Sequence, residues 1–485
     1  MTTFNFEKYR PTLHFAPQKN WMNDPNGMVY FKGEYHLFFQ HNPNDSIWGP
    51  MHWGHAVSRD MIEWQELPIA LYPDELGTIF SGSAVVDWHN TTGLFPDEPG
   101  IVAIFTHHLD KADGTTAIQT QSLAYSHDQG RTWTKYEGNP VLGHPTKVDF
   151  RDPKVFWHTK TAKWLMTLAT GQTVTFYSSP NLIDWQFESE FGDNIGSHDG
   201  VWECPDLFEL VVDNSEEKKW VLLVSIGDNP QFDSGSRTQY FVGSFDGSTF
   251  TADHQEIQWL DFGKDNYAGV SFSDIPTEDG RRIYLGWMSN WRYANEVPTE
   301  GWRSQMTLPR TLALQHVGDQ LLVVQNPVKE LDSYFTKVVE IDDVLINGEE
   351  TKTFAVDKSS VEIVLTIDNN DAKQFGVELS HTESQKTLLT IDAETNFVTL
   401  DRKNSGEITF SENFSNRQEL NLQVTNQVKL RIIVDSSSIE IFLNEGAYAV
   451  TSLIYPDKVC EEIALFASGG AIQLTNSYIS VSHSL

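Results

Sequence analysis

Cysteine, long apolar runs, basic residues and helix signals are all scarce in this 485-residue chain. The two cysteines, Cys204 and Cys460, are far apart, so a disulfide framework is excluded. We expect two buried free thiols; a single disulfide between them is the alternative. No cluster of Cys and His has zinc spacing, and no acidic segment has the pattern of a calcium loop. We therefore expect neither a metal ion nor any other cofactor.

No segment approaches the ~18 consecutive apolar residues that a membrane helix needs. Residues 1–8 lack the basic stretch and the apolar run of a secretory signal. We therefore expect the protein in the cytoplasm, or outside the cell if a leader has been removed. The 34 Lys and Arg residues face 67 Asp and Glu residues, which gives a formal net charge of −33. That charge excludes nucleic acid and anionic membranes as partners and leaves the oligomeric state open.

What the chain does contain is typical of a globular protein with two domains: 39% of its residues are hydrophobic and 21% are charged. Short apolar runs bounded by Gly, Pro, Asn and Asp predict many short strands. A weak repeat leads from an apolar stretch through a serine and a turn to an aromatic residue, at Trp64, Trp133, Trp185 and Phe250. The shared order and near-regular spacing favour a repeating unit over four unrelated hairpins.

A second repeat places a carboxylate shortly before a proline, with a hydrophobic strand after it, at Asp24, Asp152 and Glu203. Ser81 and Tyr267 occupy the equivalent places in two further units. Five units of this length match five four-stranded blades of a β-propeller. Because the innermost strand of each blade lines the axis, we expect these five residues to converge on one pocket at one end of it.

The character of the sequence changes at about Tyr334, after which Trp is rare and polar residues alternate with apolar ones. Residues 428–435 and 438–443 predict half-buried antiparallel strands joined by a tight turn. A β-sandwich of roughly 150 residues fits this region. The predicted fold is all-β, with a five-bladed β-propeller over residues 1–326, a linker over 327–333 and a C-terminal β-sandwich over 334–485.

Three carboxylates around one pocket suit glycoside hydrolysis. One attacks the anomeric carbon, a second, protonated one delivers a proton to the leaving oxygen, and a third can hold ring hydroxyls. Purely structural alternatives exist, because Asp24 lies among turn-forming residues and Asp152 follows a potential ion-pair partner, Arg151. Most of the 15 tryptophans are expected to pack between blades. The candidates for stacking on sugar rings are Trp48, Trp287 and Trp302.

Four motifs, in this order, resemble those of the invertase–levanase–inulinase family of β-fructofuranosidases, glycoside hydrolase family 32. They are residues 21–27 (WMNDPNG), 80–83 (FSGS), 151–153 (RDP) and 203–206 (ECPD). The resemblance covers nearly the whole chain and shows no departure at a catalytic motif. Residues 286–291 and 302–310 look more like the levanase, inulinase and yeast-invertase branch than the sucrose-6-phosphate branch.

The resemblance implies a propeller followed by a sandwich, in agreement with the repeats. It also implies a retaining enzyme with Asp24 as nucleophile, Asp152 as transition-state stabiliser and Glu203 as acid/base. The residues that it places around the fructosyl unit are Asn23, Gln40, Trp48, Phe80, Ser81, Arg151, Tyr267 and Trp287.

A pocket at one end of a five-bladed axis is expected to admit only a terminal unit, so we expect exo-acting release of fructose from sucrose, fructo-oligosaccharides, inulin or levan. Three alternatives remain open. A propeller lectin would bind sugar without cleaving it, and a fructosyltransferase would use a sugar as acceptor with the same catalytic residues. An inverting arabinan hydrolase would hold its two catalytic carboxyls ~6.5–9.5 Å apart instead of ~5–5.5 Å.

Overall fold

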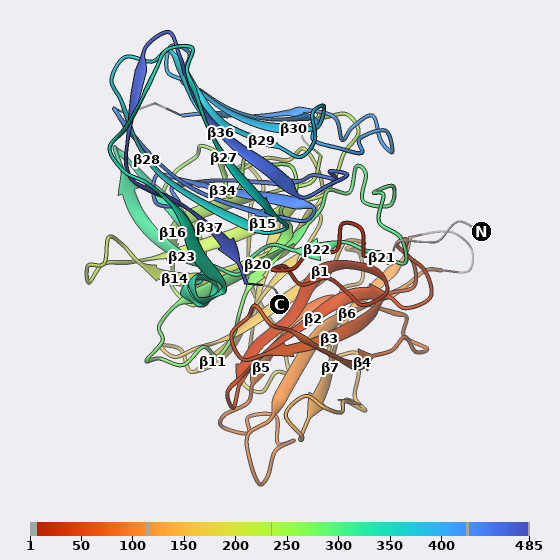
Figure 1. The fold of residues 1–485 in the computed structure, drawn as a ribbon. Coiled ribbons are helices and arrows are strands. Elements are labelled where there is room, and N and C mark those ends of the chain that lie inside the picture. Colours follow the sequence, from red (N-terminus) through yellow and green to blue (C-terminus); the bar gives the residue numbers. More distant parts are fainter. Residues whose placement is uncertain (1–6, 112–115, 234, 423–425, 484–485) are drawn as a thin grey trace, which may run out of the picture.

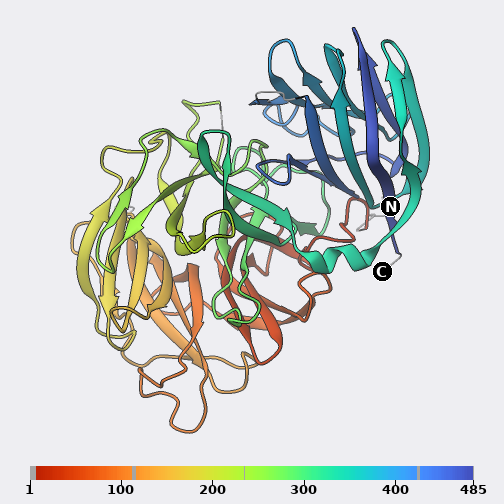
Figure 2. The same cartoon turned by 90° about the vertical axis from the view of Figure 1, so that its left-hand side faces the viewer.

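The computed structural model describes residues 7–111, 116–233, 235–422 and 426–483. Five mainly antiparallel sheets surround one axis, and two further sheets form a sandwich beside them (Figure 1). Figure 2 shows the sandwich, coloured cyan to blue, to one side of the propeller, which the red-to-green part of the chain forms. The prediction of an all-β propeller followed by a sandwich is confirmed.

Each blade of the propeller is one sheet. Blade I contains β1 (Asn20–Phe31), β2 (Glu34–Asn42), β3 (His52–Ser58) and β4 (Gln65–Leu71), with β21 (Trp302–Arg303) beside β1. Blade II contains β5 (Thr78–Val86), β6 (Ile101–Leu109), β7 (Ile118–Ser126), β8 (Thr134–Lys135) and β9 (Leu142–Gly143). Blade III contains β10 (Arg151–His158), β11 (Lys163–Ala169), β12 (Val174–Ser179) and β13 (Gln186–Phe191). Blade IV contains β14 (Trp202–Val211), β15 (Lys218–Ile226), β16 (Arg237–Phe245), β17 (Phe250–Ala252) and β18 (Gln258–Trp259). Blade V contains β19 (Tyr267–Ser271), β20 (Arg282–Met288), β22 (Gln305–Met306), β23 (Arg310–Val317) and β24 (Gln320–Pro327).

The first strand of every blade belongs to the wall of the axis. β1 contacts β5, β5 contacts β10, β10 contacts β14, β14 contacts β19, and β19 contacts β1 again, so the ring closes. A parallel bridge between Val29 and Ser273 joins blades I and V across that closure. The five inner strands run in the same direction, and their first residues therefore lie at the same end of the axis.

The serine-turn-aromatic repeat is the turn between the third and fourth strands of a blade. The indole N–H of Trp64 donates to the carbonyl of Met61 at 2.8 Å, three residues earlier in the chain. The same bond recurs at Trp133 and Trp185, at 3.0 and 2.8 Å. Each ring also packs against the core between blades, for example Trp133 against Phe38 with ring centroids 5.3 Å apart. The repeat therefore sets the blade's outer turn and its packing at once.

After β24, the short 3-10 helix η1 (Lys329–Tyr334) leads into the sandwich. Its first sheet contains β25 (Phe335–Ile341), β26 (Val344–Asn347), β28 (Val361–Asn369), β33 (Gln427–Asp435), β34 (Ser438–Leu443), β35 (Tyr448–Leu453) and β37 (Ala471–Ser482). Its second sheet contains β27 (Thr351–Lys358), β29 (Gln374–Ser380), β30 (Lys386–Asp392), β31 (Phe397–Asn404), β32 (Arg417–Asn421) and β36 (Cys460–Ser468). The exact domain limits stay a prediction, because strand ends mark regular structure rather than folding units. Among the described residues, no helix has the length and hydrophobicity needed to cross a bilayer.

Buried charges join the two domains. Arg310, on β23 of the propeller, donates to Oε2 of Glu440 on β34 of the sandwich at 2.6 Å and to Oδ2 of Asp261 at 3.1 Å. His14 lies between Asp435 and Glu440, at 2.7 and 3.0 Å. Because removing one member of a buried pair leaves the other charge uncompensated, this network holds the sandwich against the propeller.

Candidate active site

Each inner strand carries an irregularity at its head, at the residues that the second repeat picked out. The pairing shifts between Met22 and Pro25, which brackets Asp24 in β1, and the same break occurs around the other four heads. These lie at residues 79–82, 151–154, 203–206 and 267–270. A bulge bends the strand and re-aims its side chains, and a proline is tolerated there because no ladder hydrogen bond is lost. The carboxylate-proline pattern in the sequence therefore indicates a β-bulge at the start of the inner strand.

The backbone at three of these heads is held in the left-handed region. Asp152, Cys204 and Ala268 have φ values of 62°, 47° and 53°. Such conformations are uncommon for residues other than glycine and cost free energy, so the surrounding structure must impose them. In blade I, Gly27 (φ 53°) lies in a second pairing shift, between Asn26 and Val29, where an added Cβ would approach Phe38 to 2.5 Å. Local strain at the heads coincides with the candidate site.

Asp24 is held by three donors. Ser81 Oγ donates to its Oδ2 at 2.6 Å, Asn23 Nδ2 donates to its Oδ1 at 3.0 Å, and Cys204 Sγ lies 3.5 Å from Oδ2. Trp21 donates to Asn23 at 2.7 Å, which fixes the amide in turn. Burial raises the pKa of Asp24 above its ordinary value, and the bond from Ser81 opposes that change. Because both of its oxygens are held, the carboxylate has one defined orientation.

Asp152 lies in the neighbouring wall of the same site. The backbone N–H of Cys204 donates to its Oδ2 at 3.0 Å, and Cys204 Sγ lies 3.6 Å from the same oxygen. Burial raises the pKa of Asp152 to about 7, although the positive charge of Arg151 lowers it and the nearby carboxylates raise it further. Both cysteines, Cys204 and Cys460, are buried and free, as the sequence predicted.

Glu203 accepts hydrogen bonds from two sides. Arg151 Nη2 donates to its Oε1 at 3.0 Å, and the Tyr267 hydroxyl donates to its Oε2. Arg151 also pairs with Asp149. Side chains from blades III, IV and V therefore meet at this one carboxylate. The Tyr267 side chain is buried, so it acts on the site by holding Glu203 and not by contacting the cavity.

A cavity of about 150 Å³ opens above these carboxylates, and we call it the axial cavity. It is far smaller than the ~300–1,000 Å³ pockets of drug-sized ligands. The lining residues are Asn23, Asp24, Gln40, Trp48, Phe80, Ser81, Arg151, Asp152, Glu203 and Trp291. All of them except Trp291 were predicted from the sequence. The structure thus brings together all three predicted catalytic carboxylates and six of the eight predicted binding residues.

Two aromatic candidates differ from expectation. Trp287 has no exposed surface and packs behind Trp291, with ring centroids 4.8 Å apart, so Trp291 faces the cavity in its place. Trp302 is 1% exposed and lies beneath the guanidinium of Arg10 at 4.6 Å, so it is not available for stacking on sugar. The Gly, Pro and Asn residues near both tryptophans indicate turns, but they do not indicate which side chains cover those turns. Trp48, by contrast, is 45% exposed at the rim.

Two residues of the site were missed from the sequence. Trp291 follows Trp287 by four residues in the segment 286–291, and only packing decides which of the two faces outward. Cys204 was expected only as a buried free thiol, yet it contacts both Asp24 and Asp152. Its place between the acidic residue and the proline of the third carboxylate motif was the available signal.

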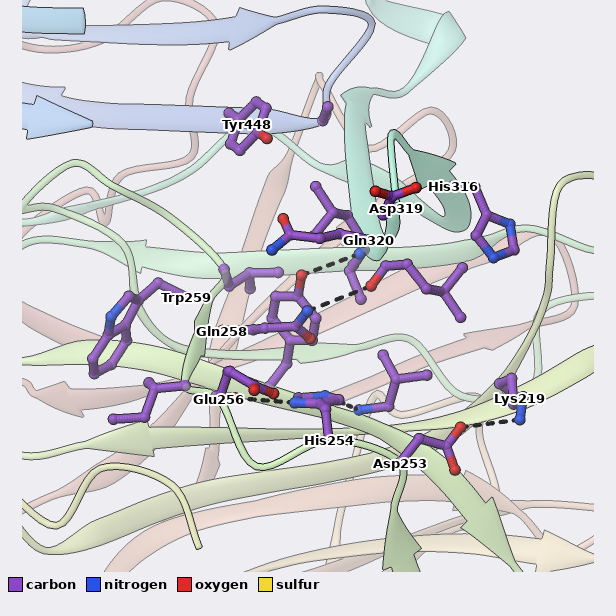
Figure 3. Close-up of a pocket in the computed structure, with 18 of the residues that line it drawn as sticks. Lys219, Asp253, His254, Glu256, Gln258, Trp259, His316, Asp319, Gln320 and Tyr448 are labelled. Atoms are coloured by element: carbon purple, nitrogen blue, oxygen red, sulfur yellow. Dashed lines mark hydrogen bonds and ion pairs between the residues drawn. The ribbon is translucent and has the colours of Figure 1, made fainter. Parts of the chain in front are cut away.

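Besides a hollow of about 380 Å³ at the β3–β4 turn of blade I, two larger cavities lie elsewhere. The junction cavity, of about 740 Å³, lies between blades IV and V and the sandwich, where Trp259, Gln258 and Tyr448 line it (Figure 3). The basal cavity, of about 440 Å³, is lined by residues near the ends of the inner strands. Neither contains any of the three predicted catalytic carboxylates, so size does not identify the reacting centre. Across the described ranges, no three His, Cys, Asp or Glu side chains are grouped to hold a metal ion.

Comparison with known proteins places this geometry in a family. The model of the glycosyl hydrolases family 32 N-terminal domain matches residues 14–327, and that of the family 32 C-terminal domain matches residues 330–483. A levanase of Bacillus subtilis is 48% identical over 477 residues, covering 96% of this chain and 69% of the relative. An extracellular exo-inulinase of Aspergillus awamori is 37% identical over 508 residues, covering 97% and 94%.

Solved structures agree. The Aspergillus awamori exo-inulinase superposes with a TM-score of 0.90 at 35% identity, covering 99% of this chain and all of the other. A fructofuranosidase from Schwanniomyces occidentalis, complexed with fructose, superposes with a TM-score of 0.90 at 33% identity over the full length of both chains. With both domains, the order of the motifs and the convergence of the carboxylates in agreement, the chain belongs to glycosyl hydrolase family 32.

Proposed function

We propose that the protein is a retaining, exo-acting β-fructofuranosidase that releases terminal fructose from sucrose, fructo-oligosaccharides and the fructans inulin and levan. The observation that carries this proposal is the convergence of Asp24, Asp152 and Glu203, from three stretches of the axis wall, on one small cavity. The relatives' names support the substrate class: a levanase and an exo-inulinase are both similar over nearly the whole of this chain.

In the first step, Asp24 attacks the anomeric carbon while Glu203 gives a proton to the glycosidic oxygen. The bond to the leaving group breaks, and a fructosyl ester forms on Asp24. The bonds from Ser81 and Asn23 orient the attacking carboxylate, which supplies the positioning that a near-attack geometry needs. Cys204 contributes a backbone N–H to Asp152 and so links the acid's strand to the third carboxylate.

In the second step, Glu203 takes a proton from water, and the resulting hydroxide attacks the same carbon and releases Asp24. Arg151 and Tyr267 hold Glu203 in place through both steps. Asp152 faces the ring and, once ionised, stabilises the positive charge that develops in both transition states. Two displacements at one carbon return the starting configuration, so the enzyme retains it.

The size and floor of the axial cavity favour release from a chain end. Beneath the carboxylates, Lys154 donates to the carbonyl of Ser271, and the hydroxyl of Ser271 donates to Asp206 at 2.7 Å. These bonds join β10, β14 and β19 across the axis and close the cavity from below. With about 150 Å³ above that floor, we infer that the cavity takes one terminal unit and does not let the chain continue past it.

Release of fructose from sucrose, inulin and levan, measured with excess chelator present, tests the proposal. We expect fructose from all three, with release by the Asp24→Asn variant reduced at least about 10²-fold. Binding of these sugars without any release would instead indicate a lectin, and formation of longer oligosaccharides as the main product would indicate a fructosyltransferase.

A further inference from the structure

The basal cavity lies at the other end of the propeller axis from the candidate active site. The predicted catalytic residues stand at the starts of β10 and β14, whereas the basal cavity is lined by residues 156–158 and 207–209, farther along the same strands. Val86, at the end of β5, and Asp274, just after β19, complete the same rim. The two cavities share no lining residue, and the hydrogen bonds that join Lys154, Ser271 and Asp206 lie between them, so they are separate sites.

The floor of the basal cavity holds two cations and two carboxylates. Arg282 Nη1 donates to Ser271 Oγ at 3.3 Å, and Ser271 Oγ donates to Oδ2 of Asp206 at 2.7 Å, so these two charged groups meet at one hydroxyl. Lys154 is buried beside them and donates to the Ser271 carbonyl. Asp274 faces the same space and accepts the indole N–H of Trp88. The charges of this floor balance, which favours a neutral ligand over an ion.

Two polar atoms of this floor have no partner among the described residues. They are Oδ1 of Asp206, an acceptor, and Nε of Arg282, a donor, and both are buried. Both atoms have almost no accessible surface, so they lie beneath the floor and a ligand in the cavity does not bind them directly. The polar side chains that a ligand can reach are those of the rim, among them His89, Lys160 and Glu209. A sugar hydroxyl can bind such groups, because it donates to a carboxylate and accepts from an ammonium group.

Aromatic rings form the wall above that floor. Trp88 is 51% exposed, and its bond to Asp274 Oδ1 at 2.8 Å fixes the plane of the indole. Trp157 and Trp220 are partly buried in the same wall. Trp164 is 4% exposed and bonded to Thr91 at 2.8 Å, so it belongs to the core. Large flat rings that remain exposed around hydroxyl-binding groups provide the two contacts a sugar needs: apolar C–H faces against aromatic faces, and hydroxyls against charged groups.

The junction cavity fits a sugar less well, although it is larger. Four carboxylates and one lysine line it, and Lys219 is already paired with Asp253 at 3.0 Å (Figure 3). Its indole, Trp259, is covered on one face by the guanidinium of Arg237, 3.4 Å from the ring centroid. Tyr448, from the sandwich, is the aromatic ring that stands opposite (Figure 3).

We propose that the basal cavity is a second, non-catalytic site that binds a segment of a neutral oligosaccharide, of the fructan class on which the proposed function acts. One ring of the chain stacks on Trp88, and its hydroxyls bind polar side chains of the rim such as Lys160 and Glu209. Because this site lies at the far end of the axis, it holds a polysaccharide without blocking the axial cavity. It retains the enzyme on polymer while the axial cavity removes chain ends.

Titration calorimetry with a fructo-oligosaccharide tests the proposal in the Asp24→Asn background, which prevents consumption of the ligand. We expect two binding events per chain, and only one in Asp24→Asn/Trp88→Ala, with at least a tenfold loss of affinity for the missing event. Trp88→Phe keeps a stacking face and is expected to restore part of it. Phe187→Ala removes a ring of similar exposure, 56%, from blade III, and is expected to change nothing.

A second readout uses the otherwise unaltered enzyme. Trp88→Ala is expected to leave kcat and KM on sucrose unchanged and to raise KM on levan or inulin polymer several-fold, with Trp157→Ala acting in the same direction. Identical titrations with and without Trp88 would mean that the cavity holds water only and would overturn the proposal. Loss of the second event in Tyr448→Ala instead would move the site to the junction cavity, which overturns it too. If sucrose is not hydrolysed at all, the proposed function is wrong. The Trp88-dependent binding is still measured by calorimetry, so failure of the second site and failure of the proposed function are distinguishable.

Discussion

Arg151 lies closer to Glu203 than to its own neighbour in the chain. Its Nη2 donates to Oε1 of Glu203 at 3.0 Å, whereas its Nε is 4.0 Å from Oδ2 of Asp152. The local ion pair that sequence proximity suggested is therefore the weaker contact, and the guanidinium is shared with Asp149 as well. Asp152 is left buried with incomplete compensation for its charge.

That incomplete compensation gives a prediction about stability. Asp152 has a folded-state pKa of about 7 against an ordinary value of 3.8, so the folded state binds its proton more tightly than the unfolded state. The resulting stabilisation is complete below about 3.8 and is lost as pH rises through about 7. Asp152→Asn does not titrate there. We expect its melting temperature to exceed that of wild type by about 1–3 °C at pH 8, with a smaller difference at pH 5, in scanning calorimetry. A difference that grows toward low pH would contradict this role of Asp152.

The assigned roles of Asp24 and Glu203 predict large kinetic effects. Glu203→Gln removes the proton donor without loss of volume, and we expect kcat on sucrose to fall about 10²–10⁴-fold. Asp24→Asn removes the nucleophile, and its kcat is expected to fall at least as far. The circular dichroism spectra of both variants are expected to match that of wild type. Asp97→Asn, at an exposed carboxylate, is the matched control. Wild-type turnover in either variant would refute the role given to that residue.

The leaving group offers a finer test of Glu203. With a fructoside whose leaving group needs little protonation, the first step of Glu203→Gln is expected to recover relative to sucrose, because the missing proton matters less. Asp24→Asn is expected to show no such recovery. Equal recovery in both variants would mean that Glu203 does not act as the acid.

The stereochemistry of the product tests the retaining mechanism. Two displacements at one carbon restore the β configuration of the released fructose. Proton NMR during early hydrolysis of sucrose, before mutarotation, is expected to show the β anomer first. Initial release of the α anomer would support the inverting alternative.

The closed floor of the axial cavity predicts the order of products. Incubation with inulin or levan is expected to yield free fructose from the first minutes, without a ladder of intermediate oligosaccharides on chromatography. An early ladder would mean that the polysaccharide chain passes through the site and that the floor at Lys154 and Ser271 does not close the axial cavity. That outcome would leave the catalytic roles of the three carboxylates unaffected.

The domain interface predicts a loss of stability toward alkaline pH. Burial alone would lower the pKa of His14, but its hydrogen bonds to Asp435 and Glu440 raise it to about 9. The stabilisation is therefore complete below about 6.5 and is lost as pH rises through about 9. We expect the melting temperature of wild type to fall across that window. His14→Gln is expected to be less stable at pH 6.5 and nearly equal at pH 9.5, unlike the exposed control His127→Gln, which tracks wild type.

The sequence by itself determined the repeating architecture and the positions of the candidate catalytic groups. A carboxylate before a proline at the head of a hydrophobic strand is a local pattern, because the bulge that it encodes forms within a few residues of the chain. Because the blades repeat that pattern, Asp24, Asp152 and Glu203 converge once the five blades close into a ring. The spacing of the repeats predicted those five blades. The motifs then identified the family.

Tertiary structure alone decided which side chains complete the site and what holds the domains together. Trp287 and Trp291 are alike in local sequence and both pack against Trp21, but Trp287 also packs against Tyr267 and is fully buried, which leaves Trp291 at the cavity. Arg310 and Glu440 are 130 residues apart, and no pattern in either segment indicates their contact. Strand periodicity sets the face on which a side chain lies, but its partner is supplied by another blade or by the sandwich, and that choice depends on how the sheets pack.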